Sequence, residues 1–552
     1  MNRLIDTIRT VDITRANSII HEHCGIVDFF LSEEEKNDFV SNHSFDINYL
    51  NEDRVAYGDW QTPEALAHRV LEKHISQYGV PDILIEPTCG LGAFVKAAIE
   101  KCTGISEIHA IEINSEYVNE LKFKILTDSL ELPRKTHPDI YIYNCDIFQF
   151  NISPIIDKAH SHGWNLGILG NPPWVTNSRQ GKDLSTNIPL KQNLYGLKGI
   201  EAITGKSNFD ISEYITLQLM KSAQNNNGGI SFLLKNSVIR NLLTKQKIEG
   251  LHIGDIRQEV IDASAEFDVS VDASCMSARF GCDPSLVCEV KDFYTGHFIR
   301  EYGWIKDSFV SDTDKYHQFA KYDTHSSYNW RSGIKHDCAS VLELTLSDGM
   351  YKNGYGEVVN IEKDLIYPLM KSSDINHYHE ESVRKFVIVP QRRIGEDTNS
   401  LKEYYPLAYS YLKSHEEDFS RRKSSIYRGK DPFSIFGVGD YSFSPYKIVV
   451  SSLYKDIRFL LISKYDGKPI IVDDTCYQLD FDNEDEAKAI YEALCSTEFQ
   501  TLMQSLIFKD AKRVVTKTLL MRFDLIQICK DKSIQLNPHR REKYEERQLS
   551  LF

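Results

Sequence analysis

The feature that most limits the possible folds is a regular alternation between about residues 55 and 300. Short apolar runs, such as 83–86 and 108–112, are each followed by a segment with helical periodicity. Strands that alternate with helices form a mostly parallel sheet that helices cover. We therefore predict a doubly wound α/β domain over residues 51–300, with ligands bound at the carboxyl ends of its strands. Further strands are expected at 140–143, 166–169, 230–234 and 273–280.

The chain on either side of this domain has a different character. Residues 1–50 predict a helical N-terminal extension, with the acidic run Glu33-Glu34-Glu35 near a helix start. After about residue 300 the alternation stops, and aromatic and charged residues become more frequent. We expect residues 315–535 to form a second domain of the α+β class. The charged residues 536–552 are expected to be a frayed tail.

Composition argues against membrane proteins and disulfide scaffolds. The chain of 552 residues is 41% apolar, and no stretch approaches the ~20 consecutive apolar residues of a membrane span. The N-terminus lacks the apolar core of a signal peptide, so we expect a cytoplasmic protein with no membrane partner. The 11 cysteines form no CxxC pair, and the cluster of His21, His23 and Cys24 has no second ligand pair. The sequence therefore predicts no metal site.

The net charge of −15 is unevenly distributed. Residues 1–150 carry 25 acidic and 13 basic side chains, whereas residues 384–430 carry 11 basic and 6 acidic ones. A locally basic segment in an acidic chain is compatible with a nucleic acid bound by one face of the protein. An ordinary solvated surface is the alternative explanation for that segment alone.

An acidic residue and a glycine-containing turn follow the first predicted strand. Glu86 ends the strand, and Gly90 and Gly92 let the backbone pass close to a ligand. A carboxylate here disfavours a phosphate and favours a cationic group, such as the amino group of a methionine moiety. A tight connection between strand and helix is the alternative explanation for the glycines alone.

Acidic residues also stand at the ends of the next two predicted strands. Glu112 lies about 20 residues after the glycine turn, where folds of this kind bind nucleoside hydroxyls. Asp146 follows the third strand and can accept a hydrogen bond from an adenine amino group, with Ile147 or Phe148 against the ring. Three acidic strand ends in succession indicate a nucleoside ligand.

The fourth predicted strand is followed by Asn171-Pro172-Pro173-Trp174. These residue types suit an exocyclic amine of adenine or cytosine, whose lone pair is delocalised into the ring. The side-chain oxygen of Asn171 and the main-chain oxygen of Pro172 can accept its two N–H groups, and the prolines preorganise these acceptors. Trp174 offers a flat face on which the base can stack, worth ~1–3 kcal/mol per base. A base in a duplex must be flipped out to reach such a pocket.

The glycine turn, the acidic strand ends and the Asn-Pro-Pro-Trp tetrapeptide follow one another in this order between about residues 58 and 280. This arrangement resembles the gamma class of amino-methyltransferases of type II restriction–modification systems, the Taq methyltransferase-like enzymes. The resemblance implies a seven-stranded, Rossmann-like class I methyltransferase domain that binds S-adenosylmethionine and methylates N6 of adenine in double-stranded DNA. It also implies a separately encoded cognate restriction endonuclease as a partner. By matching motif positions, the cofactor would be lined by Thr62, Glu86, Pro87, Thr88, Cys89, Gly90, Gly92, Glu112, Ile113, Asp146, Ile147 and Asn171.

The resemblance extends to a second aromatic residue and to the C-terminal domain. Phe267 matches the position of an aromatic that contacts the flipped base, although acidic and small residues follow it where the family has basic ones. The family places its target-recognition domain after the catalytic domain, here residues 315–535. Segments 330–337 and 390–393 are similar to parts of that domain, and nominate for DNA contact Arg331, Lys335, Arg392 and Arg393. Surface salt bridges are the alternative role for each of the four.

Other functions share parts of this pattern. The Asn-Pro-Pro-aromatic string also occurs in enzymes that methylate an RNA base or a protein glutamine, and the long region after 300 disfavours the second of these. N4-cytosine methyltransferases more often have Ser in place of Asn171. A bifunctional nuclease–methyltransferase is a further alternative, because Asp283, Glu289 and Lys291 fit a loose metal-nuclease pattern that recurs by chance. Intact motif residues disfavour a non-catalytic DNA-binding relic.

Overall fold

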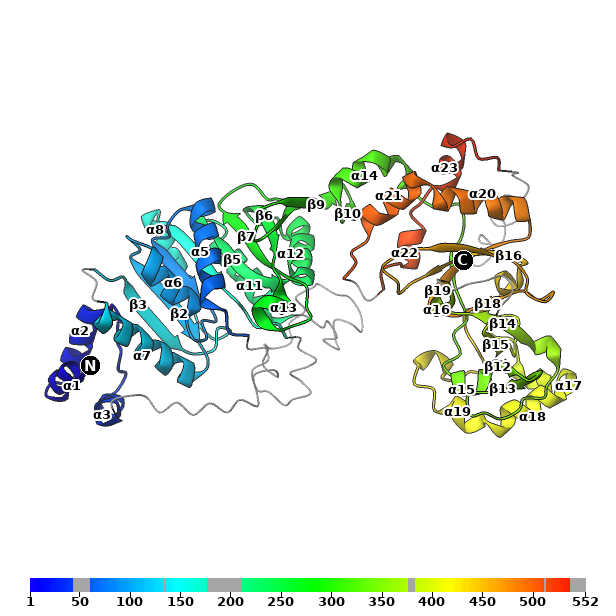
Figure 1. Ribbon diagram of the computed structural model, residues 1–552, viewed down its shortest axis with the longest axis horizontal. Helices are drawn as coiled ribbons and strands as arrows, with labels where there is room; N and C mark the ends of the chain where they lie inside the picture. The colour runs from blue at the N-terminus through cyan, green and yellow to red at the C-terminus, as the bar shows by residue number, and fades with distance from the viewer. Residues whose placement is uncertain (43–59, 133–135, 176–209, 376–382, 511–512, 537–552) are drawn as a thin grey trace. The chain divides into compact units, whose positions relative to one another are not determined.

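The chain divides into two compact units, Met1–Phe309 and Val310–Phe552 (Figure 1). The structure, a computed structural model, describes residues 1–42, 60–132, 136–175, 210–375, 383–510 and 513–536. Residues 43–50 of the predicted N-terminal extension and residues 537–552 of the predicted tail lie outside the described residues.

A ten-stranded sheet forms the centre of the first unit, in the order β10-β9-β8-β6-β7-β5-β4-β1-β2-β3. The run from β3 to β5 is parallel, and β7 is antiparallel to β5. Every residue of β1 and β2 is buried, which is typical of a sheet covered on both faces. The strands are β1 (Ile83–Glu86), β2 (Glu107–Glu112), β3 (Asp139–Asn144), β4 (Asn165–Gly170), β5 (Asn227–Lys235), β6 (Ile253–Val260), β7 (Ala273–Phe280), β8 (Val287–Asp292), β9 (Phe298–Ile305) and β10 (Ser308–Val310).

The α/β prediction is confirmed, because helices connect the parallel strands. The chain winds outward in both directions from β1 and β4, so the strand order reverses between these two neighbours. That reversal is the place where open α/β sheets bind ligands. The helices are α5 (Glu64–Tyr78), α6 (Ala93–Lys101), α7 (Ser115–Glu131), α8 (Ser153–His162), α11 (Ile211–Ala223), α12 (Asn236–Glu249) and α13 (Ala263–Phe267).

The sheet has ten strands where the resemblance implies seven. β8 pairs in parallel with β6, and β9 then pairs antiparallel with β8, so the sheet continues past β6. The sequence does not predict these strands because charged residues interrupt their apolar pattern, as in the β8 sequence VCEVKD. β6 and β9 are also partly exposed, so neither contains a long apolar run.

Three N-terminal helices belong to the first unit: α1 (Asn2–Arg9), α2 (Ile13–Cys24) and α3 (Glu33–Asn42). Their apolar side chains join the core that also contains Leu121 and Ile125 of α7. After α2, the amide of Val27 donates to the carbonyl oxygen of Ile140 at 2.9 Å, alongside the edge strand β3. The N-terminal residues therefore cover a sheet edge that would otherwise expose unpaired backbone groups.

The second unit combines an antiparallel sheet and a mixed sheet with short helices (Figure 1). One sheet has the order β11-β19-β16-β17 and the other the order β13-β12-β15-β14-β18. The strands are β11 (Arg331–Ser332), β12 (Glu343–Ser347), β13 (Met350–Lys352), β14 (Ile366–Met370), β15 (Lys385–Ile388), β16 (Tyr446–Ser451), β17 (Phe459–Ile462), β18 (Ile471–Val472) and β19 (Cys476–Phe481). The helices are α14 (Thr313–Phe319), α15 (Ala339–Leu342), α16 (Ser372–Ile375), α17 (Leu401–Tyr404), α18 (Pro406–Ser414), α19 (Glu416–Ser420), α20 (Glu484–Cys495), α21 (Thr497–Leu506), α22 (Lys517–Leu520) and α23 (Leu525–Asp531). Among the described residues of both units, none of the helices has the length and apolar character that crossing a bilayer requires.

Candidate active site

The predicted cofactor residues gather at the carboxyl edge of the first sheet. Because β1, β2, β3 and β4 are parallel neighbours, the residues that follow them meet at one edge. Glu86 ends β1, Glu112 ends β2, and Asn171 directly follows β4. The structure thus brings together side chains that are up to 85 positions apart in the sequence, at the point where the strand order reverses.

The turn after β1 requires glycine at two positions. Gly90 and Gly92 have φ angles of +52° and +72°, in the left-handed region that other residues rarely adopt. A Cβ atom on Gly92 would lie 2.3 Å from Cδ1 of Leu121, and one on Gly90 would lie 2.6 Å from Oε1 of Gln61. The two glycines therefore give the turn a shape that larger residues cannot reproduce.

Two carboxylates hold this turn from the inside. An oxygen of Glu86 accepts the amide of Val95 in α6 at 3.1 Å. Glu112 accepts the amide of Gly90 at 2.8 Å through one oxygen and the amide of Asn114 at 2.8 Å through the other. Burial raises the pKa of the Glu86 carboxyl well above its usual range, and the negative charge of Glu112 raises it further. A cation beside the pair would relieve this repulsion.

The remaining predicted cofactor residues surround the turn. Pro87 and Cys89 are buried, and burial raises the pKa of the Cys89 thiol, which is therefore neutral. The hydroxyl oxygen of Thr88 is buried and has no hydrogen-bond partner among the described residues. Thr62 lies half-buried just before α5.

Ile113, Asp146 and Ile147 lie farther along the same edge. Ile113 directly follows β2 and leaves 52% of its surface exposed, which makes it an apolar face in a polar surrounding. Asp146 accepts the amide of Phe148 at 2.9 Å, so it shapes the turn after β3 and remains partly exposed. Ile147 is half-buried. An apolar side chain and a carboxylate are the groups that an adenine ring and its amino group require.

The segment before α5 makes contacts that the sequence does not predict. Gln61 accepts the amide of Leu91 at 3.0 Å and so supports the glycine turn. The main-chain oxygen of Trp60 accepts a hydrogen bond of 2.9 Å from the side-chain nitrogen of Asn171. This second contact fixes which end of the Asn171 amide carries the oxygen. Since it uses a backbone carbonyl, which every residue has, no side chain could have indicated it.

The side-chain oxygen of Asn171 is buried and has no hydrogen-bond partner within the described parts of the chain. A buried acceptor without a donor destabilises a protein by about 1–3 kcal/mol. The amide nitrogen of the same side chain is satisfied, so only the oxygen is left available. Asn171 is thus fixed with a free acceptor, as the interpretation of the tetrapeptide requires. Pro172 and Pro173, which follow it, are buried and half-buried.

Trp174 and Phe267 contact each other although they lie far apart in the sequence. Their ring centroids are 5.3 Å apart and the ring planes meet at 68°, an edge-to-face contact. The indole nitrogen of Trp174 donates to the main-chain oxygen of Leu233 in β5 at 3.1 Å. Only 7% of Trp174 and 8% of Phe267 are exposed. A base that stacks on Trp174 must therefore displace the ring of Phe267 or move with it.

Two of the three residues behind the nuclease alternative, Glu289 and Lys291, are engaged in ordinary ion pairs. Lys291 lies 2.8 Å from Glu289 within β8, and Arg257 of β6 lies 3.8 Å from the same carboxylate. His21, from the cluster that was considered for metal binding, pairs with Asp139 at 2.9 Å. No group of three or more potential metal ligands occurs in the part of the chain that the structure describes.

In the second unit, a single turn contacts three of the four residues predicted to bind DNA. This turn, η5 (Asp440–Phe443), follows residues 436–439. The guanidinium of Arg331 lies 5.4 Å from the ring of Tyr441, and that of Arg392 lies 4.2 Å from the ring of Phe443. Arg393 pairs with Asp440 at 3.1 Å, and both side chains are more than two-thirds exposed. Arginines that lie some 60 positions apart in the sequence thus form one cluster, which we call the η5 cluster.

Lys335, the fourth predicted residue, lies outside this cluster. Its ammonium group pairs with Asp337 at 3.1 Å and with Asp474 at 3.5 Å. Its backbone pairs with that of Phe436, which precedes η5. Nearby, Gly333 and Gly437 let two segments cross, since a Cβ on Gly437 would lie 2.2 Å from the carbonyl oxygen of Gly333.

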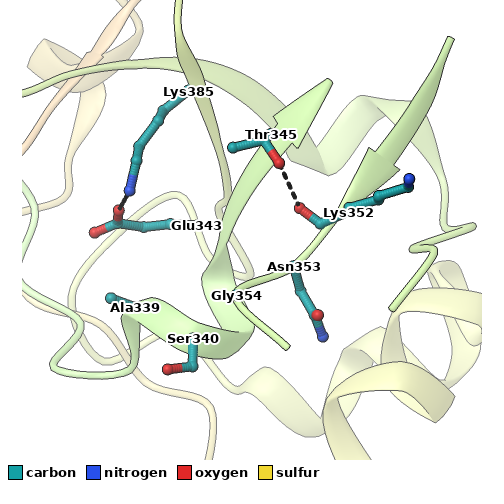
Figure 2. Close-up of a pocket in the computed structure, with 8 residues that line it drawn as sticks. All are labelled: Ala339, Ser340, Glu343, Thr345, Lys352, Asn353, Gly354 and Lys385. Atoms are coloured by element: carbon teal, nitrogen blue, oxygen red, sulfur yellow. Dashed lines mark hydrogen bonds and ion pairs between the residues drawn. The ribbon is translucent and has the colours of Figure 1, made fainter. Parts of the chain in front are cut away.

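A cavity of about 200 Å³ lies elsewhere in the second unit. Figure 2 shows that Lys385 points toward the carboxylate of Glu343, with which it pairs at 2.7 Å. Lys371 pairs with the same buried carboxylate at 2.6 Å. The lining residues are Ala339, Ser340, Glu343, Thr345, Lys352, Asn353, Gly354 and Lys385. The buried charge in this cavity is therefore already compensated.

Comparison with known proteins identifies a close relative. Over 488 residues the chain is 38% identical to the type II methyltransferase M.NspV of Nostoc sp., a match that spans 88% of this chain and 99% of the relative. No protein-family model matches the chain.

Solved structures resemble the chain at low sequence identity. The type IIL restriction–modification enzyme MmeI, solved in complex with DNA, has a TM-score of 0.48 and 13% identity over 94% of this chain and 70% of its own. The type IIG restriction endonuclease BpuSI has a TM-score of 0.38 and 12% identity over 94% of this chain and 68% of its own.

Proposed function

Because this chain belongs to the type II methyltransferases of restriction–modification systems, we propose that it transfers a methyl group from S-adenosylmethionine to N6 of adenine in double-stranded DNA. The observation that carries the proposal is the buried side-chain oxygen of Asn171, which has no donor among the described residues. It lies at the same sheet edge as the glycine turn that Glu86 and Glu112 hold.

The residues around the glycine turn fit S-adenosylmethionine. Bound there, the cofactor would supply a methyl group made electrophilic by a positively charged sulfur. Glu86 and Glu112 provide negative charge for its cationic groups, and Glu112 is the strand-end acidic residue that suits ribose hydroxyls. Thr88 contributes a buried hydroxyl without a partner among the described residues. Ile113, Ile147 and Asp146 would hold the adenine ring and its amino group.

Asn171 and Pro172 would hold the target amine. Two acceptors, one from the side chain of Asn171 and one from the main chain of Pro172, bind the two N–H groups and turn the nitrogen lone pair toward the methyl group. As the nitrogen forms its bond to the methyl carbon, the bond between that carbon and sulfur would break and leave its electron pair on sulfur. The nitrogen becomes tetrahedral and positively charged, and then loses a proton to solvent. This intermediate amine is acidic, so no strong base is required, and positioning supplies most of the catalysis. Trp174 and Phe267 would stack on the flipped base once their mutual contact opens.

Adenine is favoured over the alternative substrates. Asn, rather than Ser, stands at the first position of the catalytic tetrapeptide, which disfavours N4-cytosine. The match to a type II methyltransferase spans nearly the whole relative, which disfavours enzymes that act on RNA or on a protein glutamine. A cognate endonuclease encoded separately is part of the same proposal.

The direct test of substrate class is methyl transfer from isotopically labelled S-adenosylmethionine by the purified chain. Double-stranded DNA, transfer RNA and a protein mixture are offered in parallel. We expect label in DNA alone. After digestion of the DNA to nucleosides, the label should be in N6-methyl-2′-deoxyadenosine. Label in RNA or protein, with none in DNA, would reject the proposal.

Cofactor binding is expected to release a proton. Burial raises the pKa of Glu86 in the free protein, so a ligand that ionises this carboxyl must displace the proton that the carboxyl carries below its raised pKa. A cationic ligand favours the ionised form, so affinity should rise with pH up to the raised pKa and then level off. Calorimetry over a series of pH values, each in buffers of different ionisation enthalpy, measures the release. Glu86→Gln, which cannot ionise, should abolish it, and an equal release from this variant would assign the proton to another group.

The η5 cluster is proposed to read the target sequence. A pocket that takes one base cannot discriminate several base pairs, so groove contacts are needed, and arginine can make two hydrogen bonds to guanine. If Arg392 or Arg393 does so, its replacement by alanine should weaken cognate binding by ~1–3 kcal/mol and relax one position of the site. Methylation of a panel of single-base site variants measures this effect. Unchanged specificity and affinity in both variants would place the reading surface elsewhere.

A further inference from the structure

A second group of cations lies on the loop formed by residues 421–430, which we call the basic loop. Arg421, Lys423, Arg428 and Lys430 are all exposed. Arg421 pairs with Glu417 at 3.1 Å. Within the described residues, the other three take part in no ion pair. Asp431, the nearest carboxylate in sequence, already accepts the amide of Thr398 at 3.1 Å. The loop therefore presents, within eight residues, three positive charges that have no ion-pair partner among the described residues.

The remaining basic residue of this loop, Arg422, has a structural role. Its guanidinium lies 3.8 Å from the ring of Tyr427 and 5.0 Å from that of Phe419. It also donates to the main-chain oxygens of Ser434 and Pro432, both at 2.7 Å. Arg422 thus fastens both ends of the loop to the body of the unit. A fixed frame lowers the entropy lost when the exposed cations bind a partner.

The basic loop is connected to the η5 cluster through one pair of segments. The ring of Tyr427 lies 5.5 Å from that of Phe436, and Phe436 exchanges backbone hydrogen bonds of 2.8 and 2.9 Å with Lys335. Residues 331–335 connect Lys335 to Arg331, and residues 436–441 connect Phe436 to Tyr441. Arg331 and Tyr441 both belong to the η5 cluster. Even fully extended, the six residues 436–441 span at most about 22 Å. The basic loop therefore lies within one turn of DNA, about 34–36 Å, of the η5 cluster.

We propose that the basic loop binds the phosphate backbone of DNA beside the base pairs that the η5 cluster reads. This inference rests on the proposed function. Duplex DNA carries one negative charge per about 1.7 Å of its axis. A duplex that lies over the η5 cluster and extends as far as the basic loop therefore presents phosphate groups to the loop. Phosphate contacts set position and register and carry no sequence information. The loop should therefore raise the affinity for every sequence equally.

The test is the salt dependence of DNA binding by the full chain with Lys423→Gln, Arg428→Gln and Lys430→Gln combined. Each phosphate contact contributes about 0.9 to the slope of log affinity against log salt, so the slope should fall by about 2.7. Between 50 and 200 mM salt, the wild type should lose about 40-fold more affinity than the variant. Fluorescence anisotropy with cognate and non-cognate duplexes gives both slopes, and the methylated sequence should stay the same.

A matched variant separates local contact from total charge. Lys402, Lys464 and Lys530 are also exposed and lie in the same unit, outside the loop. Replacing these three with Gln removes the same charge and should leave the slope unchanged. An unchanged slope in the loop variant, or an equal fall in the control, would overturn the proposal, as would an altered methylated sequence. Failure of the wild type to methylate DNA would instead reject the proposed function itself.

Discussion

Replacing Asn171 with alanine is expected to lower the rate of methyl transfer about 10³-fold while sequence-specific DNA binding is retained. Removing one preorganised hydrogen-bonding group from a catalytic site lowers kcat by about 10²–10³-fold. Here the lost group is also the acceptor that holds the amine in the reactive orientation. Among the residues that the structure describes, the side chain makes one hydrogen bond, to the main-chain oxygen of Trp60, so the fold should tolerate its loss. Single-turnover transfer of labelled methyl groups gives the rate.

Two further variants serve as controls for the Asn171→Ala result. Asn37→Ala removes an exposed asparagine of α3 and should behave as the wild type. Asn171→Asp keeps an oxygen acceptor at the same place and should retain more activity than Asn171→Ala. A folded Asn171→Ala protein with nearly normal transfer would mean that another residue holds the amine.

Replacing Glu112 with alanine is expected to weaken S-adenosylmethionine binding about 100-fold. The Glu112 carboxylate accepts the amides of Gly90 and Asn114, and the proposed site also needs it for the ribose hydroxyls. The variant leaves both amides without an acceptor, and a buried group left in this way destabilises its surroundings by about 1–3 kcal/mol. Both the shape of the glycine turn and the direct contact with the cofactor should therefore be lost. Titration calorimetry measures the change in affinity.

The matched control for this variant is Glu131→Ala. Glu131 is exposed and is the last residue of α7. It therefore lies at the opposite end of this helix from the sheet edge, where α7 starts. The Glu131→Ala variant removes the same charge as Glu112→Ala. Because it does so away from the proposed site, cofactor affinity should be unaltered. An unchanged affinity of a folded Glu112→Ala protein would exclude Glu112 from the cofactor site.

The central strands of the first unit could be predicted from the sequence because they are buried on both faces. Such strands form uninterrupted apolar runs, as in β1 and β4, and each expected run lies within an observed strand. β8 and β9 could not be predicted in this way, since partly exposed strands contain charged residues such as Glu289 and Arg300. The polar strand ends were predictable because parallel strands end at a common edge.

The partners of the site residues could not be predicted. Asn171 is oriented by a backbone carbonyl 111 positions earlier in the chain, and main-chain groups carry no sequence signal. The sequence predicts both Trp174 and Phe267 as base-binding residues, but their direct contact depends on how α13 packs. In the second unit the arginines were recognisable by charge, whereas Tyr441 and Phe443 resemble the aromatic residues of any turn.

The most direct test of the central claim is single-molecule sequencing of the methylome of cells that express the chain, with cells that express Asn171→Ala as the reference. The proposed function predicts N6-methyladenine at nearly every copy of one recurring DNA sequence in the first culture and at none of them in the second. N4-methylcytosine at a recurring sequence would contradict the assignment of adenine. Identical methylomes in the two cultures would contradict the claim that this chain methylates DNA through Asn171.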